Sequence, residues 1–153
     1  MSKFKIIPIA KEYAEKIRSS MKDDFGHELH STSPTGRVLC RFCLSDGGPE
    51  HKHILFSYSP VENINPYAEV GPVYIHDDCE KYVDVYAVPH DLTTRKYLTI
   101  RGYSAEQNLI KGYMAKGNEI EETIYKLFDN TEVESIHIND ASSGCYFLKI
   151  VRG

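Results

Sequence analysis

The sequence predicts an α+β fold, in which a mostly antiparallel sheet of about seven short strands is combined with two main helices. Two observations predict it: short apolar, β-branched stretches follow one another in adjacent pairs, and only two stretches repeat with the period of a helix. Strands and helices do not alternate regularly, as a parallel sheet would require. With 153 residues, of which 41% are hydrophobic and 26% charged, residues 1–153 are expected to form a single domain.

The first part of the chain is predicted to form one strand, one helix and a loop. Residues 4–9 are apolar and β-branched, which indicates a short strand. Residues 10–21 are predicted to be helical because large apolar side chains recur every fourth residue from Tyr13 onward, with Lys and Glu between them. Residues 22–36 lose this periodicity and contain several Gly, Ser and Thr, so they are predicted to be a loop within the domain.

The middle of the chain resumes the apolar pattern at residues 38–44, which carry two cysteines, and then turns at a Gly-Gly-Pro sequence that ends at Pro49. The elements predicted after this turn are strands at 52–58 and 72–76 and a short helix at 77–84.

The last part of the chain is predicted to contain most of the sheet. One helical turn is expected within residues 89–96, and the other elements are strands at 97–103, 108–115, 133–139 and 145–152 and a helix at 119–128. The two final strands should pair as a hairpin that carries the helix on one face. The side chains expected in this core are Ile120, Ile124, Phe128, Ile136, Ile138 and Leu148.

Charge and the N-terminal sequence exclude several classes of protein. The net charge is -4, and no cluster of Lys and Arg offers the basic face that nucleic acid binding needs, so no nucleic acid partner is expected. The apolar run at residues 6–9 is too short for a secretory signal or a membrane span. A cytoplasmic location is therefore expected, where the four cysteines would be thiols or metal ligands. The sequence leaves open whether the chain forms a homo-oligomer.

Two pairs of metal-ligating residues have the same spacing. Cys40 and Cys43 are separated by two residues, and so are His76 and Cys79. This gap lets both side chains of a turn point at one ion, and Zn²⁺ prefers four Cys or His ligands in a tetrahedron. The sequence thus predicts a structural zinc site in which protein side chains fill all four positions, with a second-shell hydrogen bond from His76 to a carbonyl or a nearby carboxylate.

Two other interpretations of these residues stay open. Cys40 and Cys43 can instead be half-buried thiols of a strand, with His76 capping the helix predicted after it. A redox pair is a weaker hypothesis, since disulfide oxidoreductases place such a pair at the start of a helix within a βαβ unit.

A second group of residues combines aromatic and polar side chains on predicted strands or at loop ends. If these strands share a sheet, several of the side chains face one cleft, where Arg101 would bind a carboxylate or phosphate and His137 would act as a general base. The alternative is a sheet face of cross-strand tyrosine pairs with no ligand. The candidate ligand face consists of Tyr58, Tyr67, Arg101, Tyr103, His137 and Asn139.

These observations leave two functions open. The first is a small binding or interaction domain stabilised by zinc, and the second is a small enzyme of unassigned reaction that uses Arg101 and His137. Cys145 would be a nucleophile only if His137 faced it across the final hairpin; otherwise it is a buried structural thiol.

Five stretches of the sequence resemble the bacterial family catalogued as domain of unknown function 1203. The resemblance runs from Leu39 onward, and its name implies no activity and no catalytic residue. The stretches are Leu-Cys-Arg-Phe-Cys-Leu at 39–44, Ile-Leu-Phe-Ser-Tyr at 54–58, Pro-Tyr-Ala-Glu-Val-Gly-Pro-Val-Tyr-Ile-His at 66–76, Leu-Thr-Ile-Arg-Gly-Tyr at 98–103, and Ile-His-Ile-Asn-Asp-Ala-Ser-Ser-Gly-Cys-Tyr at 136–146.

Overall fold

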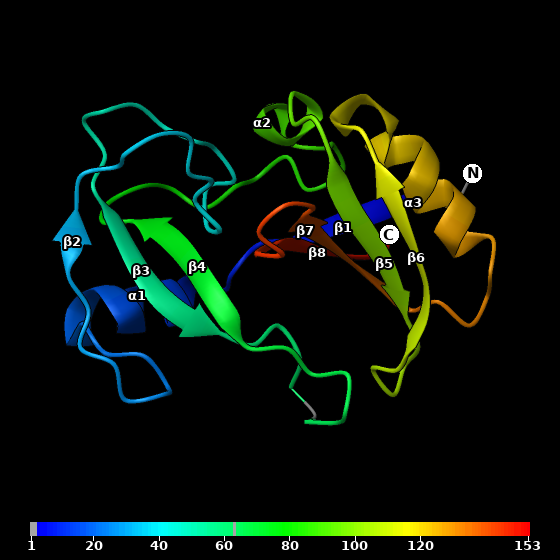
Figure 1. Cartoon of the computed structure of the whole chain (residues 1–153), viewed down its shortest axis with the longest axis horizontal. Coiled ribbons are helices and arrows are strands. Elements are labelled where there is room, and N and C mark those ends of the chain that lie inside the picture. Colours follow the sequence, from blue (N-terminus) through cyan, green and yellow to red (C-terminus); the bar gives the residue numbers. More distant parts are fainter. Residues whose placement is uncertain (1–2, 63) are drawn as a thin grey trace.

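The computed structural model describes residues 3–62 and 64–153, and in these residues eight strands form two antiparallel sheets (Figure 1). The α+β prediction is confirmed, with the strands divided between a large and a small sheet. The large sheet has the order β1-β8-β7-β5-β6 and the small sheet the order β2-β3-β4. The strands are β1 (Phe4–Ile7), β2 (Ser31–Thr32), β3 (His53–Tyr58), β4 (Gly71–His76), β5 (Leu98–Tyr103), β6 (Leu109–Ala115), β7 (Ser135–Asp140) and β8 (Tyr146–Arg152).

Two helices of nine and ten residues accompany the sheets, as the periodicity predicted. Helix α1 (Lys11–Ser20) lies beside the small sheet, and helix α3 (Ile120–Phe128) covers one face of the large sheet (Figure 1). A short helix, α2 (His90–Thr93), supplies the predicted single turn, and a 3₁₀ turn, η1 (Gly117–Glu119), leads into α3.

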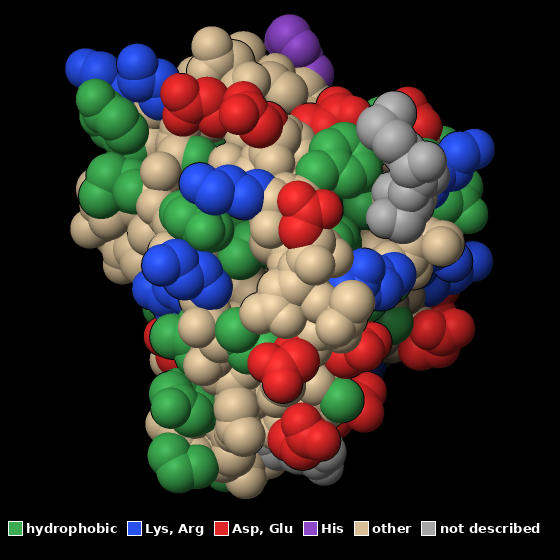
Figure 2. Space-filling view, turned by 90° about the vertical axis from the view of Figure 1, so that its right-hand side faces the viewer, with side chains coloured by type: hydrophobic (Ala, Val, Ile, Leu, Met, Phe, Trp, Pro, Cys, Tyr) green, Lys and Arg blue, Asp and Glu red, His purple; other side chains and the backbone are tan. Residues whose placement is uncertain are grey.

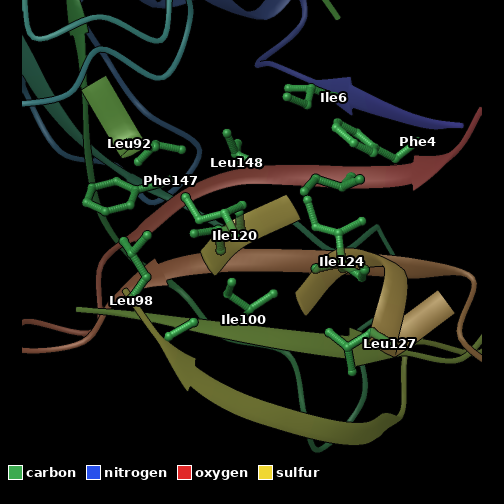
Figure 3. Packing of buried hydrophobic residues seen from close by; sticks show 14 of the residues in the cluster. Phe4, Ile6, Leu92, Leu98, Ile100, Ile120, Ile124, Leu127, Phe147 and Leu148 are labelled. Carbon is green, nitrogen blue, oxygen red and sulfur yellow. The ribbon is translucent and has the colours of Figure 1, made fainter. Parts of the chain in front are cut away.

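The core of the large sheet lies between α3 and the strands. Ile120, Ile124 and Leu127 point from the helix toward Leu98 and Ile100 of β5 (Figure 3). Because side chains of a strand alternate between its faces, burial of this set fixes the register and leaves the opposite face of β5 and β7 for polar side chains. All six predicted core residues are buried: Ile120, Ile124, Phe128, Ile136, Ile138 and Leu148.

The small sheet has a separate core that α1 closes from one side. Ala14 and Ile17 of α1 pack in the same buried cluster as Ile54, Phe56 and other residues of β3 and β4. In this article the small-sheet region means β2, β3, β4, α1 and the turn at residues 39–45, and the large-sheet region means β1, β5 to β8 and α3.

Residues 39–44 connect the two cores. Leu39 and Leu44 are buried in the cluster of the large sheet, whereas Cys40 and Phe42 are buried in the cluster of the small sheet. The Arg41 side chain lies between them and donates to the carbonyl of Tyr146 at 2.7 Å. Different residues of one short segment are therefore buried in the two cores and hold the two regions together.

Two local predictions need correction. The predicted loop at 22–36 includes the short strand β2. The helix predicted at 77–84 is absent. The His76 carbonyl, which would accept the first hydrogen bond of that helix, instead accepts two hydrogen bonds from Arg18, at 3.1 and 3.0 Å.

The surface around α3 and β6 mixes both signs of charge. Lys and Arg side chains are interspersed with Asp and Glu on this face, and none of them forms a continuous basic area there (Figure 2). Among residues 3–62 and 64–153, no helix has both the length and the apolar character that crossing a bilayer would take.

Candidate functional site

The first two metal-ligating residues lie on a tight turn. The amide of Leu44 donates to the carbonyl of Cys40 at 2.8 Å, and the amide of Cys40 donates to the carbonyl of Ser45 at 3.0 Å. Leu44 has φ +57°, a conformation uncommon for a residue with a side chain, and its burial in the large core holds it there. This closure of the backbone brings the side chains of Cys40 and Cys43 to one side.

The second pair completes a cluster of four ligands. His76 is the last residue of β4, and Cys79 follows in the loop after it. One ligand atom from each of Cys40, Cys43, His76 and Cys79 lies within 4.8 Å of all the others, which is close enough to bind one metal ion. The prediction that the two pairs converge is confirmed, and the alternative of strand thiols with a helix-capping histidine is wrong.

Two distances within the cluster fit a tetrahedral ion. Sulfurs about 2.3 Å from one Zn²⁺ at the tetrahedral angle lie about 3.8 Å apart, and a sulfur and an imidazole nitrogen lie about 3.5 Å apart. The Sγ atoms of Cys40 and Cys79 are separated by 3.7 Å. The Sγ atom of Cys43 is 3.3 Å from Nδ1 of His76. If one tetrahedral ion were bound here, these four side chains would fill all four of its positions.

The surroundings of Cys40 favour a thiolate. Backbone amides of His76 and Cys43 donate to its Sγ atom at 3.2 and 3.5 Å. Burial alone would raise the pKa of Cys40, but hydrogen bonds from Cys43, Cys79 and His76 lower the pKa well below its usual range. Hydrogen bonds to Cys40 and Cys79 raise the pKa of Cys43, because the three sulfurs cannot all be charged without a cation. A metal ion would supply that cation.

Arg18 of α1 is the charged residue that faces the cluster from outside. Its guanidinium donates to the Sγ atom of Cys79 at 3.2 Å and, as noted above, to the carbonyl of His76. Three thiolates and one Zn²⁺ carry a net charge of -1, which the positive charge of Arg18 offsets. Nothing in the sequence marked Arg18, since its position on α1 is 58 residues before His76.

The predicted second-shell partner of His76 is wrong. Its Nε2 atom is buried and has no hydrogen-bond partner among the described residues, and neither Asp77 nor Asp78 bonds to it. Packing holds the ring instead: His51 stacks on it with centroids 4.5 Å apart. A Cβ atom on Gly47 would lie 2.7 Å from the ring, so the loop can pass this close only with glycine, which also has φ +66° there.

The six residues of the candidate ligand face lie around one cavity of about 350 Å³. Tyr58 comes from the end of β3, and Tyr67 comes from the loop before β4. The remaining four, Arg101, Tyr103, His137 and Asn139, come from β5 and β7. The cavity therefore lies where the small-sheet and large-sheet regions meet. That these residues bind a ligand stays a prediction.

The pairing of β5 with β7 forms the floor of the cavity. Arg101 lies opposite His137, and Thr99 lies opposite Asn139, so Arg101 and Asn139 are diagonal neighbours on one face. Arg101 donates to the carboxylate of Glu69 at 2.9 Å, on the loop that borders the cavity. Burial, together with the positive charges of Lys149 and Arg101, lowers the pKa of His137 to about 3, so its imidazole is neutral at physiological pH.

Aromatic rings surround His137 and extend to β3. The centroids of Tyr103 and His137 are 4.5 Å apart, those of His137 and Tyr146 are 5.5 Å apart, and those of Tyr58 and Tyr146 are 5.8 Å apart. Burial raises the pKa of all three tyrosines above the usual range, which keeps them uncharged. The cross-strand aromatic pairs expected from the sequence are thus present, and they line a cavity.

Cys145 fits neither of the two roles predicted for it, a nucleophile paired with His137 or a buried structural thiol. It is half-buried rather than buried, and it lines the cavity together with Tyr146 and Ser143. No hydrogen bond joins its sulfur to His137 among the described residues, so the pairing that a nucleophile would need is not formed. No disulfide joins any of the four cysteines, all of which lie in the described residues.

Comparison with known proteins places the chain in a family. The model of a family described as "Protein of unknown function (DUF1203)" matches residues 38–152. The chain belongs to this family. No curated protein and no solved structure matches it. The matched residues include all four metal-ligating residues and all six residues of the candidate ligand face, whereas Arg18 and the rest of α1 precede the match.

Proposed function

We propose that the chain is a small binding domain that holds a structural Zn²⁺ at Cys40, Cys43, His76 and Cys79 and binds a small molecule in the cavity. Four free thiols fit a reducing compartment such as the cytoplasm. Cavities of about 300–1,000 Å³ with apolar walls and a few convergent polar groups are typical of small-molecule sites. At about 350 Å³, this cavity lies at the small end of that range.

One observation carries the proposal: the metal-ligating cluster and the cavity share no residue. A catalytic zinc keeps one position open to water or substrate, whereas a structural zinc is enclosed by four protein ligands. The cluster has four protein ligands and lies away from the lining of the cavity. This division supports a stabilising role for the metal and a separate binding role for the cavity.

The metal is tested by purifying the protein without a chelator and measuring its metal content by mass spectrometry. We expect close to one zinc per chain, which Cys43→Ser abolishes and Cys145→Ser, the matched control, leaves unchanged. X-ray absorption at the zinc edge should give sulfur ligands at about 2.3 Å and a nitrogen ligand at about 2.0 Å. Folded protein without any bound metal would overturn this part of the proposal.

A small enzyme is the second candidate, because Arg101 and His137 lie side by side on the cavity floor. The pKa of about 3 for His137 argues against an enzyme, since a general base works best with a pKa near the pH of the reaction. If the protein converted a bound molecule, product would accumulate with wild-type protein and not with His137→Gln. Recovery of an unchanged ligand after long incubation supports binding without catalysis.

A further inference from the structure

Two residues that line the cavity, His137 and Asn139, each carry a buried polar atom that has no partner among the described residues. Nε2 of His137 and Oδ1 of Asn139 belong to residues that are 4% and 3% exposed, and neither atom has a hydrogen-bond partner within the described residues. A buried polar atom without a partner costs about 1–3 kcal/mol. A ligand that supplies these hydrogen bonds recovers that cost.

The orientation of the Asn139 amide determines whether the ligand group beside it is a hydrogen-bond donor or acceptor. Its Nδ2 atom donates to the carbonyl of Gly144 at 3.0 Å in the turn between β7 and β8. This bond fixes the amide and leaves Oδ1, which is only an acceptor, as the free atom. The ligand group beside Asn139 must therefore be a donor, such as a hydroxyl or a ring N–H.

Among the described residues that line the cavity, Arg101 is the one cation, and its present partner is easily displaced. The Nη1 atom of Arg101 is bound to Oε1 of Glu69. The Glu69 side chain is 57% exposed and that of Arg101 27%. Exposed ion pairs contribute about 0–1 kcal/mol, whereas a guanidinium binds a well-placed carboxylate through two parallel hydrogen bonds. A ligand carboxylate can take the place of Glu69.

The walls favour a flat ring between these two polar ends. Tyr103, His137 and Tyr146 form a continuous series of ring contacts, and Tyr58 extends it to the small-sheet region. Aromatic side chains pack best against another ring, edge to face or offset. Arg101 and Asn139 are diagonal neighbours on the sheet, with backbone positions about 7–8 Å apart, so one small ring compound can span both residues.

We propose that the cavity binds a small aromatic carboxylate that carries a hydroxyl or N–H group opposite the carboxylate. Arg101 binds the carboxylate, the tyrosines enclose the ring, and Oδ1 of Asn139 accepts a hydrogen bond from the donor. This assignment rests on the proposed function of the cavity as the ligand site. It adds the chemical class of the ligand.

The test compares 4-hydroxybenzoate with its neutral isostere 4-hydroxybenzamide by titration calorimetry on the zinc-loaded full chain. We expect the acid to bind about 10- to 100-fold more tightly than the amide, the usual difference for a charged hydrogen-bonded pair. Arg101→Met should abolish the preference. Glu69→Gln should strengthen binding of the acid several-fold and leave the amide unchanged, because it removes the competing carboxylate. Lys111→Met, which removes a cation outside the cavity, is the matched control.

Alkylation of Cys145 by iodoacetamide locates the binding, because this thiol lines the cavity and the other three cysteines belong to the proposed zinc site. Bound acid should slow its labelling, measured by peptide mass spectrometry. Protection of Cys145 with equal affinity for acid and amide would overturn the carboxylate class and leave the cavity as the ligand site. Failure of anionic, cationic and neutral ring compounds alike to protect Cys145 would overturn both the class and the proposed function of the cavity.

Discussion

The large-sheet region and the small-sheet region differ in what holds them together. Within the described residues, the large sheet is associated with eighteen buried residues in one apolar cluster, and the small sheet with ten. The small cluster also contains Cys40, and Cys43 and Cys79 pack against it. An apolar core that small is marginal by itself, and domains of this kind gain stability from metals or disulfides. The proposed zinc would therefore substitute for apolar area in the small-sheet region.

Removal of zinc should have the largest effect, and it should be confined to one region. A structural zinc contributes about 10–16 kcal/mol of apparent binding free energy in small zinc-dependent folds, more than the small core can replace. We expect a chelator to abolish the protection of amides in α1, β3 and β4 against hydrogen exchange, and to leave β5, β7 and β8 protected. Hydrogen exchange with mass spectrometry measures this directly.

Cys43→Ser should reproduce the pattern of the chelated protein, and the chelator should then have no further effect. Uniform loss of protection across both sheets would contradict the comparison. It would mean that the turn at residues 39–44, which contributes to both cores, transmits the loss of the metal to the large sheet.

A substitution that leaves a void in the large core should cause the next largest loss of stability, whether or not metal is bound. Ile138 is fully buried between β7 and α3, and Ile138→Ala is expected to lower the free energy of unfolding by about 2–5 kcal/mol. Ile138→Val is the milder control, at about 0.5–1.5 kcal/mol. Urea unfolding followed in zinc-loaded and chelated protein should give the same loss in both. A loss that depends on zinc would show that the two cores unfold as one.

Acid should weaken the large-sheet region through His137. Burial lowers the pKa of His137 to about 3 from the ordinary value of 6.5, so the unfolded chain takes up this proton first as the pH falls. The contribution of His137 to stability is therefore complete above pH 6.5, and it falls by about 1.4 kcal/mol per pH unit down to about pH 3. Urea unfolding of His137→Phe and wild type, from pH 7.5 to 4.5, should show a difference that grows toward acid. A difference in unfolding free energy that stays constant with pH would show that the His137 imidazole is not buried in its neutral form.

Arg18 and Arg152 allow a matched comparison with a smaller effect. Both guanidinium groups donate to backbone carbonyls, Arg18 to that of His76 and Arg152 to those of Phe128, Asn130 and Val133, but only Arg18 also reaches a metal-ligating sulfur. Arg18→Gln should weaken zinc affinity about 10- to 100-fold, the usual effect of losing an outer-shell partner. Competition with a chromophoric chelator measures it.

Arg152→Gln should lower stability without changing zinc affinity. Equal zinc affinities of the two variants and wild type would mean that Arg18 contributes packing alone.

Residue spacing in the sequence identified the four Cys and His residues that converge, and alternation identified the large core. Cys40 and Cys43 have the same spacing as His76 and Cys79. A spacing of this kind is a local property of the chain and does not depend on the tertiary structure. The burial of Ile136 and Ile138 follows from the two-residue period of a strand, which is also local. The side chains of the candidate ligand face were recognisable for the same reason, since Arg101 and His137 alternate with core residues.

The sequence did not reveal the partners of these residues, because they depend on contacts between distant segments. No helix forms at 77–84, and the His76 carbonyl that would begin it accepts hydrogen bonds from Arg18 instead. No local pattern in the sequence records this contact across 58 residues. No local pattern records the stacking of His51 on His76 either, or the hydrogen bond from Arg101 to Glu69.

The sequence by itself therefore determined the fold class, the four Cys and His residues that form one cluster, and the face of the sheet that carries polar side chains. Only the tertiary structure decided that the strands divide into two sheets with separate cores, and that one cavity forms where they meet. The physical reason is that spacing and alternation act within one element. The division of apolar area between two cores, and the space left between them, depends on how all the elements pack.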